Sequence, residues 1–549
     1  MPGRDGEQRG RAGVRSGRRG RTSERVAQGN GLGRREGERT RVPHRPRVGL
    51  DNDRREASAR LHELGSSEVR VALIAPPWEV MPNSYPPLGL GYLASVAQRS
   101  GHEVRIFDFG LTPQVSTAQA VESVSPFNPQ VVGISAWTHT FHRSLELARA
   151  LKSAHGATTI FGGPHPTVFP TETLANDGVD HVAMGEAEET FVEFLARLEA
   201  KATMDGVLGL CYKDGSSLRQ NAPRPFIRDL DALPLPDRDL LNVAAYPLRA
   251  ANGAPMTTVL TSRGCPYACV YCYKGLFGTR YRERSAESVI SEIEGLMTKY
   301  GFRDFYFVDD LFVFNMERLR RILALIREKR LSIRWQCLAR VDRMPREAYA
   351  EMAEAGCDEI HFGIESGSPE ILKTIGKHIT IAQVENAVRW AKEAGIKTKG
   401  YFMTGLPGDT MRTMKQTLDF ACRLHLDDAM FSLTTPLPGT RLWELVKDKL
   451  PSLSQHDTFA KAFYFAGGDQ IREPLFNLSN VDGKKLVQFT QNAPNVFWKR
   501  TARRREFKAR FGAVMGDAIW RLSLVTLWRP VAWLKRALFQ RHDAQLSHA

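Results

Sequence analysis

Residues 259–272 read VLTSRGCPYACVYC and carry the most informative pattern in the chain. The run begins as a short apolar strand that ends near Arg263, and Cys265, Cys269 and Cys272 then follow on one loop. The chain has seven cysteines, an odd number, and its N-terminus lacks the apolar segment of an export signal. Both features argue against a disulfide framework. Three closely spaced thiols on one loop predict a metal centre instead.

The number of thiols narrows the choice of metal. Structural zinc normally takes four protein ligands, and no fourth cysteine or histidine lies near this loop in the sequence. A [4Fe–4S] cluster is usually held by four thiolates, one for each iron. Three thiolates would leave one iron open to a substrate or cofactor, as reductive chemistry at a cluster requires. We therefore interpret the loop as a [4Fe–4S] site, with a zinc knuckle or plain buried cysteines as alternatives.

Alternating strands and helices follow this loop. From Val259 to roughly Leu450, apolar runs are separated by amphipathic helices such as 285–300 and 381–394. Six strand–helix units in sequence predict a parallel barrel, or most of one, with its functional groups at the carboxyl ends of the strands. The expected strand ends are Arg263, Asp309, Arg340, Glu365, Gly405 and Pro436.

An earlier part of the chain shows the same alternation. Short apolar strands separated by helices predict a doubly wound parallel sheet of the Rossmann or flavodoxin type. Ligands of such sheets bind beyond the carboxyl ends of the strands. The glycine- and proline-rich segments fall at these ends, which predicts a ligand cleft there; they are 76–77, 162–165 and 185–186.

Composition divides the chain into five segments. The net charge of +15 lies at the two ends: residues 1–60 hold 17 Arg against eight Asp and Glu, whereas residues 61–498 carry a net charge of −3. A basic groove for nucleic acid in the folded body is therefore not expected. No apolar run is long enough to span a membrane, so we expect a cytoplasmic protein. The segments are a disordered basic tail at 1–68, the first α/β domain at 69–204, a linker at 205–250, the partial barrel at 251–450 and a basic, mainly helical extension at 451–549.

The segment CPYACVYC at 265–272 resembles the cluster loop of radical S-adenosylmethionine (SAM) enzymes. The preceding α/β domain resembles the cobalamin-binding domain of one large branch of that family, so the resemblance covers about residues 69–450. It implies that the open iron chelates the methionine end of SAM and that the cluster donates an electron that splits the sulfonium. An external donor of the flavodoxin or ferredoxin type would supply that electron.

The resemblance also implies contacts with SAM. Tyr271 would lie against the adenine, and Asp309 would accept a hydrogen bond from the methionine ammonium. Arg340 would pair with the methionine carboxylate, while Glu365 and Ser366 would contact the ribose. For each of these residues an ordinary ion pair or helix cap is the alternative.

The cobalamin resemblance departs from one common pattern. The chain has no D-x-H-x-x-G motif, whose histidine binds cobalt from below in many cobalamin domains. We therefore expect cobalt without a protein histidine, with His165 as the alternative ligand. The residues expected to approach cobalamin are Pro77, Tyr85, Ser135, Trp137, Gly162, Gly163, His165, Gly185 and Glu186.

An apolar stripe at helical spacing lies near the end of the chain, with basic residues around it. A basic helix that bears tryptophans can lie on an anionic membrane, or its apolar stripe can dock on the protein body. We favour docking, and peripheral membrane contact is the alternative. The stripe consists of Trp520, Leu524, Leu527, Val531, Leu534 and Leu538.

The resemblance implies a cobalamin-dependent radical SAM methyltransferase that acts on an unactivated carbon of a small molecule. One SAM would methylate cobalamin, and a second would generate the radical that abstracts hydrogen. The alternative is a radical oxidative cyclase like the anaerobic magnesium-protoporphyrin monomethyl ester cyclase. A non-catalytic metal-binding module is the alternative of a different class.

Overall fold

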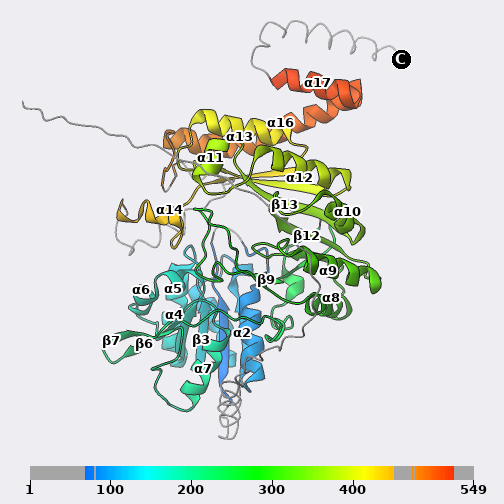
Figure 1. Cartoon of the computed structure of the whole chain (residues 1–549). Helices are drawn as coiled ribbons and strands as arrows, with labels where there is room; N and C mark the ends of the chain where they lie inside the picture. Colours follow the sequence, from blue (N-terminus) through cyan, green and yellow to red (C-terminus); the bar gives the residue numbers. More distant parts are fainter. Residues whose placement is uncertain (1–67, 80–81, 251, 450–472, 475, 525–549) are drawn as a thin grey trace, which may run out of the picture. The chain divides into compact units, whose positions relative to one another are not determined.

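The computed structural model describes residues 68–79, 82–250, 252–449, 473–474 and 476–524 (Figure 1). The predicted tail at 1–68, apart from Glu68, lies outside these residues. So do Leu527, Val531, Leu534 and Leu538 of the predicted C-terminal stripe. None of the helices in the described ranges is both long and apolar enough to cross a membrane.

The first sheet has seven strands in the order β2-β1-β3-β4-β5-β6-β7. Strands β1 to β5 are parallel, as the alternation of strands and helices predicted. Residues 210–220, which we expected in a linker, instead add two antiparallel strands at one edge. Every residue of β7 is exposed, so this strand lacks the apolar alternation by which a strand is recognised in sequence. The strands are β1 (Arg70–Ala75), β2 (Glu103–Asp108), β3 (Val131–Ser135), β4 (Thr158–Gly162), β5 (His181–Ala183), β6 (Leu210–Asp214) and β7 (Ser217–Gln220).

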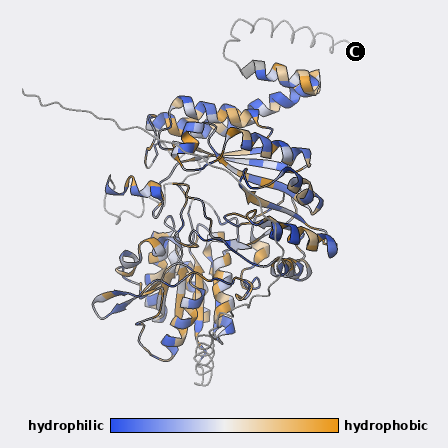
Figure 2. Cartoon of the chain, in the orientation of Figure 1, coloured by the Kyte–Doolittle hydropathy of each residue, from blue (hydrophilic) through white to orange (hydrophobic). Residues whose placement is uncertain are grey.

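Helices cover both faces of this sheet. Alternate residues of β1 point to opposite faces, so Leu73 packs with α2 and α7, whereas Ile74 packs with α3 and α4. Figure 2 shows the resulting pattern, with the hydrophobic colour concentrated on the strands. The helices are α2 (Leu88–Arg99), α3 (Thr117–Val124), α4 (Phe141–His155), α5 (Pro164–Val168), α6 (Pro170–Leu174) and α7 (Glu188–Glu199).

The second sheet has six parallel strands in the order β15-β14-β13-β12-β11-β8, which confirms the predicted partial barrel. The strand ends lie within a few residues of those expected, because glycine, proline and charged residues mark the end of each apolar run. The strands are β8 (Met256–Val259), β11 (Asp304–Phe307), β12 (Arg334–Ala339), β13 (Cys357–Glu365), β14 (Lys397–Thr404) and β15 (Asp428–Leu433).

The two faces of this sheet differ in polarity. One face packs into the largest apolar core, with buried aromatic side chains such as Phe305 and Trp335 against the helices. The opposite face carries Tyr306, His361 and Tyr401.

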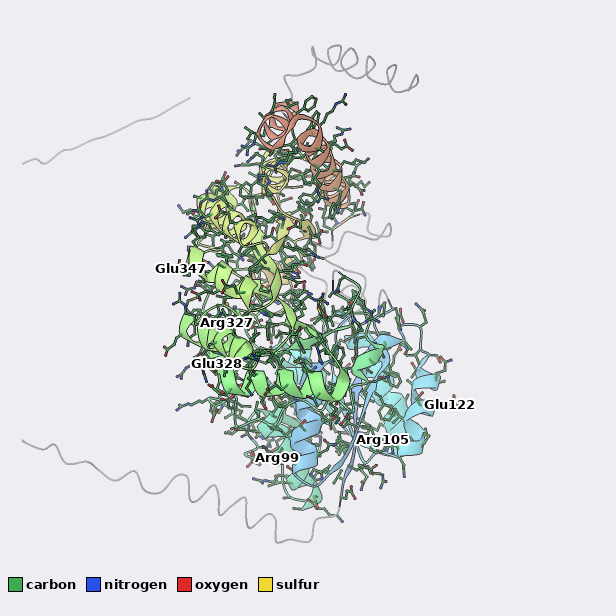
Figure 3. All side chains as sticks on the ribbon, turned by 90° about the vertical axis from the view of Figure 1, so that its right-hand side faces the viewer. Arg99, Arg105, Glu122, Arg327, Glu328 and Glu347 are labelled. Atoms are coloured by element: carbon green, nitrogen blue, oxygen red, sulfur yellow. The ribbon has the colours of Figure 1, made fainter. Side chains whose placement is uncertain are left out.

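Charged residues at helix surfaces, such as Arg327 and Glu328, point away from the ribbon (Figure 3). The helices are α8 (Ala286–Tyr300), α9 (Met316–Glu328), α10 (Arg346–Glu354), α11 (Pro369–Thr374), α12 (Ile381–Glu393), α13 (Met411–Arg423) and α14 (Arg441–Glu444).

Two helices, α16 (Gly483–Phe511) and α17 (Ala513–Leu524), end the described part of the chain. Trp520 on α17 is 1% exposed. Its indole Nε1 donates to the Arg500 carbonyl oxygen at 2.8 Å, and the Arg504 guanidinium lies 4.3 Å from the ring centre. The described end of the predicted stripe is therefore docked on α16.

Candidate active site

The loop with the three cysteines joins two short strands, β9 (Ser262–Arg263) and β10 (Arg282–Glu283). These strands pair antiparallel, with Arg263 opposite Arg282, so the pair closes the base of the loop. Gly264 starts the loop at φ +82°, where a side chain would overlap the Arg280 carbonyl oxygen. The loop is therefore a closed unit that extends from the first barrel strand, as the sequence predicted.

The donor set on the loop fits a [4Fe–4S] cluster. Cys265 and Cys269 are buried and Cys272 is exposed. No group of three His, Cys, Asp or Glu side chains among the described residues can hold a single metal ion. A cubane cluster does not need such convergence, because each thiolate binds a different iron atom. The remaining four cysteines lie buried in the apolar cores: Cys211, Cys337, Cys357 and Cys422.

A second segment holds the cluster loop from the side. The Val270 amide donates to the Ile375 carbonyl oxygen at 3.1 Å. Gly376 follows at φ +64°, and a Cβ there would lie 3.3 Å from the Ala268 carbonyl oxygen. The Val270 carbonyl oxygen accepts from the Leu442 amide at 3.0 Å. The turn after α11 and the start of α14 therefore fix the middle of the loop.

Three polar side chains meet beside the cluster loop. The Tyr271 hydroxyl donates to Glu365 Oε1 at 3.0 Å and accepts from Lys377 Nζ at 3.1 Å. Lys377 Nζ also donates to Glu365 Oε1 at 2.9 Å. The pKa of Tyr271 is raised well above its usual value, mainly by burial and secondly by the Glu365 carboxylate. The hydroxyl therefore stays protonated and able to donate. The structure thus brings together two predicted SAM contacts and adds Lys377, which sequence reasoning missed.

The backbone around Glu365 is specialised for this arrangement. Glu365 adopts φ +68°, and the pairing of β13 with β14 shifts register between Gly363 and Glu365. A Cβ on Gly363 would lie 2.8 Å from Glu365 Oε1 and 2.9 Å from Lys377 Nζ, so a side chain there would displace both groups from these positions. Such strained positions cluster at functional sites. Ser366 lies next in sequence, fully buried, with its hydroxyl 3.0 Å from Thr417 Oγ1.

Asp309 supports the start of the cluster loop. Its carboxylate accepts from the Thr261 amide at 2.8 Å, from the Ser262 amide and from both hydroxyls of these residues. Burial raises the pKa of Asp309. The neighbouring Asp310 is exposed. The predicted contact of Asp309 with the methionine ammonium stays a prediction, and Asp310 is a second carboxylate at the same strand end.

Arg340 directly follows β12 and reaches the same region. Its Nε and Nη2 atoms donate to Asp342 at 2.9 and 3.0 Å, and Nη2 also donates to the Lys377 carbonyl oxygen at 2.9 Å. The guanidinium lies 3.6 Å from the centre of the Tyr267 ring on the cluster loop. Nη1 takes no part in these hydrogen bonds, so the predicted pairing with a carboxylate remains open to it.

The glycines predicted to approach cobalamin lie at neighbouring strand ends. Gly163 follows β4 at φ +99°, where a Cβ would lie 2.9 Å from the Ala136 carbonyl oxygen. Gly162 ends β4 beside Ser135, which ends β3. Gly185 follows β5 at φ +70°. Glycine at both positive-φ sites leaves a cradle of bare backbone at this edge, which fits the close approach of a nucleotide.

The other predicted cobalamin residues differ in exposure. Tyr85 and Trp137 are 47% and 53% exposed, and the Tyr85 ring lies 5.9 Å from the Tyr306 ring of the second sheet. His165 is 1% exposed and its ring centre lies 4.0 Å from that of Phe141. Pro77 and Glu186 are buried. The carboxylate of Glu186 binds Arg263 and Arg282 of the cluster-loop stem.

Sequence reasoning also missed a cluster of polar side chains on the face of the second sheet opposite the apolar core. His361 Nδ1 lies 3.1 Å from the Tyr401 hydroxyl and 3.3 Å from the Tyr306 hydroxyl, and His361 Nε2 lies 2.9 Å from Glu359 Oε1. These residues lie on three strands whose other face is strongly apolar. The apolar residues identify the strands in sequence, but they do not indicate which polar residues meet on the opposite face. His361 and its partners form a polar cluster on the face of the sheet opposite the apolar core.

Two family models match the chain. The radical SAM superfamily matches residues 259–421, and the B12 binding domain matches residues 79–195. An uncharacterized methyltransferase of Pyrococcus horikoshii is 38% identical over 384 residues, which cover 68% of this chain and 83% of the relative. These matches define a radical SAM enzyme with a B12-binding domain. The chain belongs to the cobalamin-dependent radical SAM family, and its cofactors are the predicted [4Fe–4S] cluster, SAM and cobalamin.

Two further relatives carry different activities in their names. Cytidylyl-2-hydroxyethylphosphonate methyltransferase of Streptomyces wedmorensis is 28% identical, covering 66% of this chain and 78% of the relative. Anaerobic magnesium-protoporphyrin IX monomethyl ester cyclase of Cereibacter sphaeroides is also 28% identical, covering 67% of this chain and 61% of the relative.

A solved structure of the methyltransferase TsrM from Kitasatospora setae, with cobalamin and a [4Fe–4S] cluster bound, has the same fold. It superposes with a TM-score of 0.58 at 20% identity, covering 70% of this chain and 75% of TsrM.

Proposed function

We propose that this protein is a cobalamin-dependent radical SAM methyltransferase that acts on an unactivated carbon of a small molecule. The observation that carries the proposal is the 38% identity to a methyltransferase over 83% of that relative's length, against 28% and 61% for the cyclase. When bound, the cluster and SAM supply hydrogen-atom abstraction, and cobalamin supplies the methyl group.

The residues of the cluster loop and the adjoining strand ends would bind the first two cofactors. Cys265, Cys269 and Cys272 would hold the cluster. Tyr271 would flank the adenine, and Glu365 would accept from the ribose hydroxyls through the oxygen that does not face Lys377. Support comes from the hydrogen bonds of Glu365 Oε1 to Tyr271 and Lys377, which leave Oε2 outside that group. At the methionine end of SAM, Arg340 Nη1 would donate to the carboxylate. Asp309, or the exposed Asp310 next to it, would accept a hydrogen bond from the ammonium.

Cobalamin and the substrate would bind on either side of this region. The bare backbone at Gly163 and Gly185 would admit the nucleotide tail, and the exposed Tyr85 and Trp137 would face the corrin. The contact between the Tyr85 and Tyr306 rings supports a corrin position next to the inner face of the partial barrel. On that face His361 and its tyrosine partners would bind polar groups of the substrate. The electron would come from a separate flavodoxin- or ferredoxin-like protein.

Product analysis separates methyl transfer from cyclisation. A methyltransferase releases S-adenosylhomocysteine together with 5′-deoxyadenosine, whereas a cyclase releases 5′-deoxyadenosine alone. The reduced holoenzyme would be incubated anaerobically with SAM, cobalamin and candidate substrates, and both products would be quantified. If substrate is converted and 5′-deoxyadenosine is released without S-adenosylhomocysteine, the methyltransferase proposal is overturned. The cyclase activity would then be supported.

Alanine substitution of the three loop cysteines tests the cluster site itself. We expect the triple variant to lose its iron after anaerobic reconstitution, because no thiolate remains on the loop. Iron content and visible absorption measure the outcome. Retention of four irons per chain would overturn the assignment and would point to the non-catalytic alternative.

A further inference from the structure

Four buried charged side chains connect the cobalamin domain to the base of the cluster loop; we call them the joint. Glu186 Oε1 accepts from Arg263 Nη1 at 3.0 Å and from Arg282 Nη1 at 2.9 Å. Arg282 Nη1 also lies 2.7 Å from Glu186 Oε2, and Glu188 Oε1 accepts from Arg263 Nη2 at 2.6 Å. Each of the four side chains keeps 8% or less of its surface exposed.

The four residues of the joint lie on elements that belong to both cofactor sites. Arg263 and Arg282 face each other on β9 and β10, and all three cysteines lie on the loop between them. Glu186 follows Gly185 at the strand end where cobalamin is expected, and Glu188 begins α7. Both stems of the cluster loop are therefore attached to one carboxylate at the cobalamin edge.

Neighbouring backbone groups and one aromatic ring add further contacts to the joint. The Ile227 amide donates to Glu186 Oε2 at 2.8 Å, and Arg282 donates to the carbonyl oxygens of Ile227 and Phe277 at 2.6 and 2.8 Å. The Arg263 guanidinium lies 5.3 Å from the ring centre of Phe277, which is on the cluster loop. Two glutamates and two arginines leave the joint without net charge.

Buried charges of this kind specify geometry more than they add stability. Removing an ion pair from water costs about as much as the pair regains, so the arrangement is favourable only when all partners meet in register. Separation of the cluster-loop stems from Glu186 would leave buried charges uncompensated. The joint therefore favours the placement of the loop in which all four side chains are paired.

We infer that the joint is a positioning device that couples cobalamin binding to the order of the cluster loop. This inference rests on the proposed function, in which both cofactors act in one site. A bound cluster orders the loop, the loop stems hold Glu186, and Glu186 holds the edge of the cobalamin site. Because coupling between two binding sites is reciprocal, the cluster must tighten cobalamin binding by the same factor as cobalamin tightens binding of the cluster.

The full chain offers a matched control for this coupling. Glu292 is also buried and binds two arginines, with Oε1 2.7 Å from Arg238 Nη2 and Oε2 bonded to Arg284 Nη1. It lies on α8 of the radical SAM domain, and its partners Arg238 and Arg284 are not members of the joint, although Arg284 follows β10 directly in the sequence. E292Q and E186Q therefore remove equivalent charges, one away from the joint and one within it.

The experiment compares cobalamin affinity with and without the cluster. Hydroxocobalamin is titrated by absorbance into the reconstituted full chain and into the same chain with Cys265, Cys269 and Cys272 replaced by alanine. We expect loss of the cluster to weaken binding by a factor in the usual range of about 5 to 150. In the E186Q background the factor should fall to about one, whereas in the E292Q background it should stay unchanged.

The possible outcomes are separated by the factor, which is the ratio of the cobalamin Kd without the cluster to the Kd with it. The Kd of a single variant does not separate them. A direct contact of Glu186 with cobalamin would shift both titrations of E186Q equally and leave the factor intact, which would overturn the inference. Equal affinities of the wild-type chain with and without the cluster would also overturn it. If E186Q does not fold, R263K, which keeps the charge but loses the bidentate geometry, should also lower the factor. Absence of cobalamin binding in the wild-type holoenzyme would instead refute the proposed function.

Discussion

Replacement of Lys377 by methionine should weaken SAM binding without loss of the cluster. The change keeps the length of the side chain but removes Nζ, which donates to Glu365 Oε1 at 2.9 Å and to the Tyr271 hydroxyl at 3.1 Å. Glu365 then keeps the Tyr271 hydroxyl as its donor in this group and loses its buried counter-charge. The carboxylate is no longer fixed in the orientation that we propose for the ribose contact.

The size of the effect follows from the hydrogen bonds that the substitution removes. A hydrogen bond to a charged group contributes about 1.5–3 kcal/mol. If the ribose contact of Glu365 is lost with its orientation, and each 1.4 kcal/mol corresponds to a tenfold change in affinity, the Kd for SAM should rise roughly 10- to 100-fold. Calorimetric titration of SAM into the anaerobically reconstituted chain measures this change, and iron analysis checks the cluster.

Lys373 provides the control, because it is an exposed lysine on α11, four residues earlier. K373M should bind SAM as the wild type does, and both variants should carry the same amount of iron. An unchanged Kd in K377M with full iron content would refute the role of Lys377. Loss of iron in K377M would show instead that the lysine supports the loop itself.

Three further predictions concern other parts of the chain. Gly163→Ala should weaken hydroxocobalamin binding in an absorbance titration, because its Cβ would lie 2.9 Å from the Ala136 carbonyl oxygen at φ +99°. Burial lowers the pKa of His181 to about 4 from 6.5, so the unfolded state binds more protons below pH 6.5 and stability falls as the pH drops from 6.5 toward 4. His181→Phe should flatten this dependence in melting curves recorded across that range. Deletion of residues 513–549 should lower the melting temperature, because Trp520 is docked on α16; unchanged melting with lost cosedimentation on anionic vesicles would support membrane contact instead.

The positions of the parallel strands along the chain were predictable because they depend on local signals. Most apolar runs end at a glycine, proline or charged residue, and the three loop cysteines lie within eight consecutive residues. Strand β7 was missed because its four residues are all exposed and carry no apolar alternation. Local pattern therefore predicts the parallel strands with long apolar runs and fails for β6 and β7, of which β6 has only two buried residues and β7 has none.

The partners of the site residues were less predictable because they are distant in sequence. Glu186 was expected at the cobalamin edge, but its bonds to Arg263 and Arg282 span 77 and 96 residues. Tyr271 and Glu365 were both expected near SAM, yet their hydrogen bond spans 94 residues and the lysine between them gives no sequence signal. Periodicity predicts which side chains are buried, but not which buried charges meet.

The interactions that hold the cluster loop differ in kind from those that hold the sheet beneath it. The sheet rests on a continuous apolar core, in which packing is favourable over a range of small displacements. The loop is held by directional polar contacts from three sides: Glu186 at its stems, Lys377 at Tyr271, and Arg340 at Tyr267. Hydrogen-bonded ions tolerate little change in distance or angle. Radical chemistry between two cofactors needs reacting atoms placed within a fraction of an ångström. The apolar core thus supplies stability, and the polar contacts supply the placement on which the proposed reaction depends.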